Sequence, residues 1–272
     1  MKKTVISAVL MAAVALGAVA EDKIIIDGST TVGPISKAFA EYYMAAQPNV
    51  NITVSESGSG NGAKGLVNAV CDVGAMSRPM KDSEFKAAAD KGIQPVAHVV
   101  ALDGLPILVH PRNPVANLTI EQIRKIYTGE ISNWSEVGGP NMGIVVITRD
   151  TNSGTYETFE KLVMNKQKIG EKAEYVGSNG AIRQRVQSTP SAIGYAGLGF
   201  VDKTVKALTV NGVYPSAATV RTGEYPIARP LFMYTAGYPK LGSAVYQFVT
   251  LHLSEDGQEM VEEIGFIPVT SY

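Results

Sequence analysis

Three short loops rich in glycine, serine and threonine hold the residues best suited to chemistry. They occupy residues 28–31, 57–62 and 153–155, and each follows a short apolar run and precedes a helical pattern. The first backbone N–H groups of a helix have no intrahelical partner, and the helix dipole adds partial positive charge there. Because glycine lets the backbone approach a ligand closely, such a loop predicts an anion site.

The loops also supply hydroxyl donors for an oxyanion. The candidates are Thr30 and Thr31 in the first loop, Ser57 and Ser59 in the second, and Ser153, Gly154 (through its backbone) and Thr155 in the third. One such loop is weak evidence, since turns and helix caps use the same residues. Three of them at the carboxyl ends of strands, where open α/β sheets bind ligands, favour one shared site.

Two arginines could balance the charge of such a ligand. Arg149 stands just before the third loop and can offer two parallel N–H donors to an oxyanion. Arg78, which follows Ser77, could do the same or could form a surface ion pair. Many neutral donors with one or two guanidiniums suit a compact tetrahedral oxyanion.

The elements that must position these loops alternate along the chain. Apolar strands are expected at 24–26, 52–54 and 144–147, and helical apolar spacing follows each of them, as at Ala63, Leu66, Val67 and Val70. Continuous β-branched runs alternating with helices predict an α/β protein whose mostly parallel sheets are covered on both faces.

The length indicates two lobes, because about 250 mature residues exceed what one core usually holds. We expect the apolar segment 105–109 to take the chain into the second lobe and residues 227–234 to bring it back. The first lobe would comprise 21–104 and 227–272, and the second 105–226, with a ligand cleft between them.

The N-terminus is typical of an exported protein. Lys2 and Lys3 precede an apolar run at 5–16, and residues 18–20 form a small-x-small cleavage site, so a signal peptide at 1–20 is expected to be cut after Ala20. The run is too short for a membrane span. No cysteine stands near the cut for lipid attachment. The mature chain is therefore expected in the periplasm as a monomer.

Composition argues against several other functions. The formal charge of −1 becomes −3 without Lys2 and Lys3, which disfavours nucleic acid and anionic membranes as partners. The three histidines, His98, His110 and His252, are too scattered for metal-binding spacing. The lone cysteine lies in an apolar run and predicts a buried, inert thiol. We expect no metal, no cofactor and no enzyme activity; an exported phosphatase is the least favoured alternative.

These motifs together resemble the PstS-type phosphate-binding proteins. The resemblance covers essentially the whole mature chain and rests on residues 28–34, 57–62, 74–78, 129–134, 192–195 and the motif Arg149-x-x-x-Ser153-Gly154-Thr155. It implies a two-lobed, type II periplasmic-binding-protein fold with mixed sheets, which holds phosphate between its lobes and delivers it to the membrane subunits of an ABC importer.

The resemblance also implies roles for individual residues. Thr30 and Thr31 would give backbone and hydroxyl donors, Ser59 would donate from the second loop with Ser57 as a near-register alternative, Arg149 would clamp the anion, and Ser153, Gly154 and Thr155 would donate from a helix start.

One position departs from the family. Well-known members carry, in a fourth loop, a carboxylate that accepts the proton of hydrogen phosphate and repels sulfate, whereas this chain has Ser77 there. Asp150 or Asp27 could take that role instead. A binding protein for another oxyanion, such as sulfate, molybdate or tungstate, therefore remains the alternative function.

Overall fold

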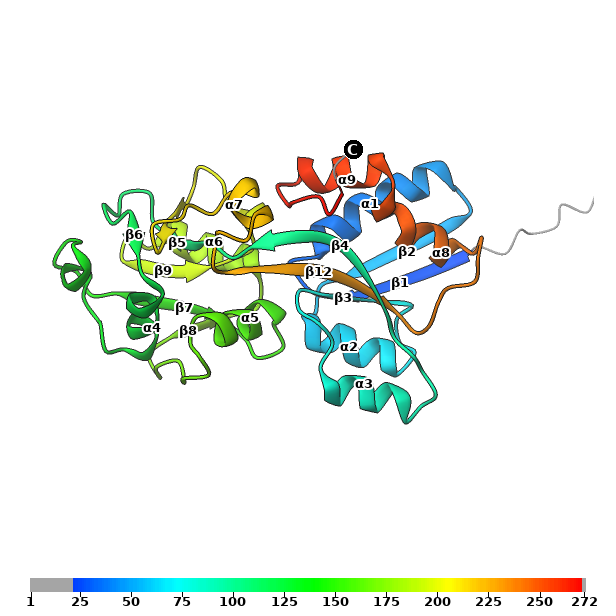
Figure 1. Ribbon diagram of the computed structural model, residues 1–272, viewed down its shortest axis with the longest axis horizontal. Coiled ribbons are helices and arrows are strands. Elements are labelled where there is room, and N and C mark those ends of the chain that lie inside the picture. The colour runs from blue at the N-terminus through cyan, green and yellow to red at the C-terminus, as the bar shows by residue number, and fades with distance from the viewer. Residues whose placement is uncertain (1–21, 271–272) are drawn as a thin grey trace, which may run out of the picture.

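The computed structural model describes residues 22–270, which contain two five-stranded sheets (Figure 1). The first sheet has the order β2-β1-β3-β12-β4 and the second the order β10-β5-β9-β7-β8. The strands of the first are β1 (Asp22–Gly28), β2 (Val50–Ser55), β3 (Val73–Met76), β4 (Val96–Gly104) and β12 (Ala228–Thr235). Those of the second are β5 (Ile107–Val109), β7 (Val145–Arg149), β8 (Glu174–Val176), β9 (Ala192–Tyr195) and β10 (Lys206–Ala207). A small third sheet pairs β6 (Asn117–Leu118) with β11 (Thr209–Val210).

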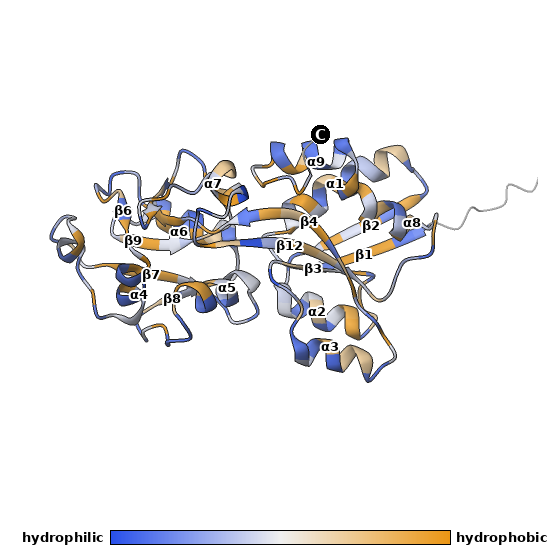
Figure 2. Ribbon diagram, viewed as in Figure 1, coloured by the Kyte–Doolittle hydropathy of each residue, from blue (hydrophilic) through white to orange (hydrophobic). Residues whose placement is uncertain are grey.

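The first sheet is covered by helices on both faces (Figure 1). On one face lie α1 (Gly33–Ala46), α8 (Ala244–Val249) and α9 (Glu255–Glu263), and on the other α2 (Ser59–Val67) and α3 (Asp82–Ala89). Each face has its own core: Ile24, Phe39 and Phe248 belong to one, Leu66 and Phe232 to the other. Apolar residues follow the strands of both sheets, as along β1 and β7 in Figure 2. This layering is what continuous apolar strands require.

The second sheet packs against α4 (Ile120–Thr128), α5 (Gly154–Leu162) and α6 (Asn179–Ser188). The short helix α7 (Ala217–Arg221) contacts β4 and adds Val220 to the same core. Its main core contains Tyr127, Trp134, Phe159 and Tyr195, with the rings of Phe159 and Tyr195 stacked at 4.0 Å between centroids. Short 3-10 helices at Trp134–Val137, Leu198–Phe200 and Thr250–Leu253 complete the described elements.

Both sheets are mixed rather than mostly parallel. The strand β1 runs parallel to β2 and β3, but β12 is antiparallel to both β3 and β4. In the second sheet β7 is parallel to β8 and β9, and β5 is antiparallel to β9. The antiparallel strands arise because the chain must leave the first sheet along β4 and return along β12.

The chain passes between the sheets at two adjacent places. The strands β4 and β12 pair from Val96↔Thr235 to Ala228↔Gly104, so both crossings start from one antiparallel ribbon (Figure 1). The segment 107–109 pairs with β9 and belongs to the second sheet, so the outward crossing lies at 104–106. We propose the two sheets and their helices as the two lobes, with the boundaries given above. Ile227 and Ile267 both pack into the core of the second lobe, so the C-terminal segment contacts that lobe as well.

A close approach of backbone fixes the first loop. Gly28 has φ +138°, and a Cβ atom there would lie 2.1 Å from the carbonyl oxygen of Ala75. Only glycine adopts this conformation without strain and leaves room for the neighbouring strand. The N–H of Ser29 donates to the carbonyl of Ala75 at 2.8 Å, so the loop after β1 is held directly against the end of β3, two residues before Ser77.

The expected signal peptide at 1–20 lies outside the described residues. Within residues 22–270, none of the helices combines the length and hydropathy that a membrane span requires.

Candidate anion-binding site

Hydroxyl groups from both lobes meet where the two sheets approach each other. The Oγ1 atoms of Thr31 in the first lobe and Thr155 in the second lie 2.9 Å apart. The hydroxyls of Ser59 and Ser77, 3.3 Å apart, face Gly154 so closely that a Cβ atom there would lie 2.5 Å and 2.7 Å from them. All five residues are buried. The structure is thus closed around this group, which we call the hydroxyl cluster: Thr30, Thr31, Ser59, Ser77, Ser153, Gly154 and Thr155.

Three helices begin at the hydroxyl cluster. They are α1, α2 and α5, whose first residues are Gly33, Ser59 and Gly154. Ser153 caps α5 by accepting a hydrogen bond from the backbone N–H of Tyr156 at 3.2 Å. In the first loop the N–H of Thr31 donates to Ser29 Oγ at 3.1 Å, so the hydroxyl of Thr31, and not its amide, is the donor directed at the cluster. Converging helix starts make a region of partial positive charge.

Arg149 ends β7 and is 1% exposed. Its Nε and Nη2 atoms donate to the carbonyls of Val176 and Gly177 at 3.1 and 2.9 Å, whereas the buried Nη1 atom has no hydrogen-bond partner. The nearest carboxylate, that of Asp150, lies 3.7 Å from Nη2 and is 40% exposed. Burial lowers the pKa of Arg149, which measures the cost of keeping this cation away from water. An anion on Nη1 would offset that cost.

Sequence reasoning missed an arginine that directly contacts the cluster. Arg229, in β12, donates from Nη2 to Thr155 Oγ1 at 3.0 Å and to Asp103 Oδ2 at 2.9 Å. Burial raises the pKa of Asp103 and opposes the effect of Arg229, while the N–H of Leu198 donates to its other oxygen at 2.8 Å. Arg229 stands in an apolar strand, so no local pattern distinguished it.

Asn179 is the other residue that was missed. It opens α6, is fully buried, and donates from Nδ2 to Thr30 Oγ1 at 3.0 Å and to Thr31 Oγ1 at 2.9 Å. A signal was present in the sequence: the segment 177–180, Gly-Ser-Asn-Gly, joins a strand to the start of a helix as the other three loops do.

Ser57 lies outside the cluster. It is exposed, and its hydroxyl donates to Asp27 Oδ1 at 2.7 Å, so of the two register alternatives the structure brings only Ser59 into the cluster. Asp27 is thereby engaged on the outer side of the loop. Asp150 accepts from the backbone N–H of Asn152 at 2.9 Å. Among the described residues, neither carboxylate forms a hydrogen bond or ion pair with the hydroxyl cluster, so neither replaces the carboxylate that Ser77 substitutes for.

The structure also gives Arg78 a different role from anion ligation. Its two Nη atoms donate to both carboxylate oxygens of Glu84 at 2.7 and 2.8 Å, and its Nε lies 2.9 Å from Glu157 Oε2. A guanidinium paired on both edges with carboxylates has no edge left for an anion. Because Glu157 belongs to α5, Arg78 links the two lobes, and Lys81 joins the same carboxylate at 2.9 Å.

The residues needed for hydrolysis are not grouped at this site. Within residues 22–270, no three His, Cys, Asp or Glu side chains gather as metal ligands. Cys71 is buried in the first lobe, and burial raises the pKa of its thiol to about 12. His98 and His252 contact each other in the first lobe, with ring centroids 6.0 Å apart. The cluster binds with donors and offers no acid–base pair.

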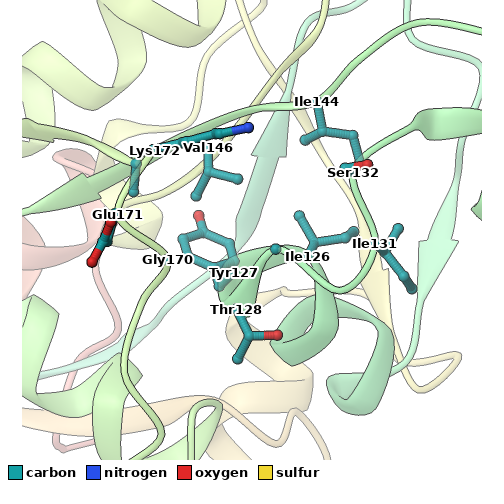
Figure 3. Close-up of a pocket in the computed structure, with 12 residues that line it drawn as sticks. Ile126, Tyr127, Thr128, Ile131, Ser132, Ile144, Val146, Gly170, Glu171 and Lys172 are labelled. Carbon is teal, nitrogen blue, oxygen red and sulfur yellow. The ribbon is translucent and has the colours of Figure 1, made fainter.

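A separate pocket of about 360 Å³ lies in the second lobe beside α4 (Figure 3). Its wall includes Tyr127, Ile131, Ile144 and Val146, and Lys172 and Glu171 lie at its edge. None of the hydroxyl-cluster residues lines it. Its largely apolar wall does not suit a small, strongly hydrated anion, so it is not the candidate site.

Two lobes that close around a buried group of donors define the class of periplasmic-type ligand-binding proteins. Residues 13–256 match the family model described as a PBP superfamily domain. The PstS phosphate-binding protein of Borreliella burgdorferi is 34% identical over 255 residues, which cover 90% of this chain and 89% of the relative. This chain belongs to the family of PstS-type phosphate-binding proteins.

Solved structures agree with this assignment. A substrate-binding protein from Clostridium perfringens, assigned to phosphate ABC transport and solved with bound phosphate, superposes with a TM-score of 0.83 at 34% identity, over 92% of this chain and all of that one. An ABC-type phosphate transport receptor from Vibrio cholerae gives a TM-score of 0.74 at 33% identity, over 90% and 99% of the two chains. The expected type II binding-protein fold is confirmed.

Proposed function

We propose that this protein captures inorganic phosphate between its lobes and delivers it to the membrane subunits of an ABC importer. The single observation that supports this most directly is the convergence of hydroxyls and helix starts from both lobes. The buried, unpartnered Nη1 of Arg149, at the end of the strand that leads into this loop, adds a free cationic donor. The proposed ligand set is Thr30, Thr31, Ser59, Ser77, Arg149, Ser153, Gly154 and Thr155. Ser57 and Arg78 are left out of it because their donors are engaged elsewhere.

Binding would couple to closure. Thr30, Thr31, Ser59 and Ser77 come from the first lobe and the other ligands from the second, so only the closed arrangement offers all donors to one anion. A ligand shifts a conformational equilibrium only through contacts that differ between the two states. Micromolar affinity requires about 8 kcal/mol, and hydrogen bonds to a charged group contribute about 1.5–3 kcal/mol each, so a handful of these donors suffices.

A second oxyanion remains a candidate because Ser77 stands where other members of the family carry a carboxylate. Among the described residues, Asp103 is the carboxylate that pairs with Arg229, the arginine that contacts Thr155. Arg229 and the backbone N–H of Leu198 already occupy both oxygens of Asp103. Fully ionised anions such as sulfate would therefore meet no free carboxylate at the cluster. This favours weaker discrimination against sulfate, not a different fold or mechanism.

Calorimetry on refolded, ligand-free protein separates these ligands. Phosphate and arsenate are expected to bind tightly. Sulfate, which is equally tetrahedral, is expected to bind more weakly but measurably, because no free carboxylate at the cluster repels it. Absence of phosphate binding, with tight binding of sulfate or molybdate, would overturn the proposed ligand.

We also propose export to the periplasm, cleavage after Ala20 and a monomeric mature protein. The basic N-terminus, the apolar run at 5–16 and the small residues at 18–20 support the first two. N-terminal sequencing of protein recovered from the periplasm, combined with light scattering of that material, tests all three. A mature chain that starts elsewhere or elutes as a dimer contradicts the corresponding proposal.

A further inference from the structure

The orientation of the Asn179 amide is fixed by its surroundings. Its Oδ1 atom accepts from the backbone N–H of Gly197 at 3.2 Å, and a backbone N–H can only donate. The Nδ2 group must therefore face the two threonines, and its two hydrogens go to Thr30 Oγ1 and Thr31 Oγ1. Asn179 is fully buried, so water does not compete for these bonds.

Thr155 receives a donor in the same way. A guanidinium has no acceptor, so Arg229 Nη2 donates to Thr155 Oγ1 at 3.0 Å, and it lies 3.4 Å from Thr31 Oγ1. Pairing with Asp103 through both Nε and Nη2 holds this guanidinium in place. All three threonine oxygens therefore accept hydrogen bonds from groups that are donors only.

A hydroxyl has one hydrogen, and an oxygen that already accepts directs that hydrogen toward a different acceptor. One of the three hydrogens is used between Thr31 and Thr155. The other two, including that of Thr30, remain to be donated. The surface formed by Thr30, Thr31 and Thr155, here called the threonine wall, therefore offers hydrogen-bond donors, and a ligand that binds against it must supply acceptors.

We propose that Asn179 is a positioning residue that sets the polarity of the Thr30 and Thr31 hydroxyls, with Arg229 doing the same for Thr155. This rests on the proposed function and deepens it: the threonine wall takes unprotonated oxyanion oxygens, and a P–OH group of the ligand must point elsewhere. Asn179 acts through the threonines and is not itself a ligand.

The substitution Asn179→Asp tests this directly, because it keeps the shape and still accepts from Gly197. A carboxylate accepts where the amide donated, so Thr30 and Thr31 would turn their hydrogens toward it and away from the anion. We expect phosphate affinity, measured by calorimetry, to fall by roughly 100-fold or more, since two hydrogen bonds to a charged ligand are lost. Asn179→Ala removes the donors without reversing them and is expected to lose only about tenfold. A packing role predicts the opposite order, because the smaller side chain leaves the larger cavity.

Two controls keep the result interpretable. Asn51→Asp adds the same charge at an exposed position of β2, outside the hydroxyl cluster, and is expected to change affinity by less than about threefold. In a Thr30→Val, Thr31→Val background the penalty of Asn179→Asp is expected to shrink, since coupled residues are not additive. Thermal unfolding of each ligand-free variant checks that it is folded.

The outcomes separate the two proposals. Failure of the unsubstituted protein to bind phosphate overturns the proposed function. Tight binding by the unsubstituted protein, with Asn179→Asp no weaker than Asn179→Ala, overturns the polarity role of Asn179 and leaves the proposed function standing.

Discussion

Replacement of Arg149 by lysine gives the sharpest test of the cluster as a phosphate site. The guanidinium donates from Nε to the carbonyl of Val176 and from Nη2 to that of Gly177, while Nη1 has no hydrogen-bond partner among the described residues. We propose Nη1 as the donor to the ligand. Lysine has one compact ammonium group on a flexible stem and cannot reach three separated acceptors at once. The substitution keeps the charge but removes the fork.

The magnitude follows from the hydrogen bonds lost. One charge-assisted bond contributes about 1.5–3 kcal/mol, and each 1.4 kcal/mol is a factor of ten, so Arg149→Lys is expected to weaken phosphate binding by about 10- to 100-fold. If the ammonium instead stays with the ligand, a buried carbonyl loses its donor, which costs about 1–3 kcal/mol of stability. A loss in affinity, in stability or in both is therefore unavoidable.

Calorimetry with phosphate and thermal unfolding of ligand-free protein measure the two losses separately. Arg185→Lys is the matched control: Arg185 also holds a two-pronged contact, to Glu174, but its side chain is 40% exposed and lies outside the cluster. Surface pairs contribute about 1 kcal/mol or less. If Arg149→Lys bound phosphate within twofold of the unsubstituted protein and unfolded at the same temperature, Arg149 would not be the ligand that we propose.

Three further predictions concern closure and stability. Gly154→Ala places a methyl group 2.5 Å and 2.7 Å from the hydroxyls of Ser59 and Ser77, which hinders closure of the lobes. Small-angle scattering is expected to show incomplete compaction with phosphate, and the affinity is expected to fall at least about tenfold. Unchanged compaction contradicts this prediction. Glu157→Gln removes the carboxylate that Arg78 and Lys81 share across the lobes. Phosphate binding is expected to weaken by about three- to tenfold and to depend less on salt than in the unsubstituted protein. An equal salt dependence would count against an electrostatic link between the lobes at Glu157. Burial lowers the pKa of His98 to about 4 and also lowers that of His252, so the unfolded chain binds more protons below the ordinary histidine pKa of about 6.5. Their contribution to stability is present above that pH and is lost as pH falls toward 4, which denaturant titrations of His98→Gln and the unsubstituted protein at several pH values can compare.

Much of the fold follows from local patterns in the sequence. The helices that begin at Gly33 and Gly154 could be expected from the loops that precede them, because each loop and its helix are neighbours in sequence. The helix α2 begins earlier than expected, at Ser59, inside the segment 57–62 that the sequence predicts as a loop. The mixed sheets could not be read so directly. The antiparallel direction of β12 depends on a partner more than a hundred residues away, and nothing local encodes it.

The same distinction explains the errors at the site. Arg149 stands next to its loop in sequence and could be proposed from that alone. For Arg78 the sequence left anion ligation and an ion pair open, and it meets Glu157 only because α5 packs across the lobe boundary. Arg229 and Asp103 are far apart along the chain, and their pairing follows from the register of β12 on β4, which no short motif reveals.

The register of β12 on β4 also bears on how the lobes close, because it sets the position of Arg229. Asp103 and Arg229 are direct partners on β4 and β12, each one residue from the place where the chain leaves or re-enters the first sheet. The same guanidinium contacts Thr155 of the second lobe and lies near Thr31 of the first. Residues close to the crossings move least when two lobes rotate about them, because displacement grows with distance from the axis. We therefore propose that Arg229 holds Thr31 in place in the open state, while Ser153, Gly154 and Thr155 at the start of α5 arrive as the lobes close. On this arrangement the first lobe offers a preformed half-site, and the second lobe completes it around the anion.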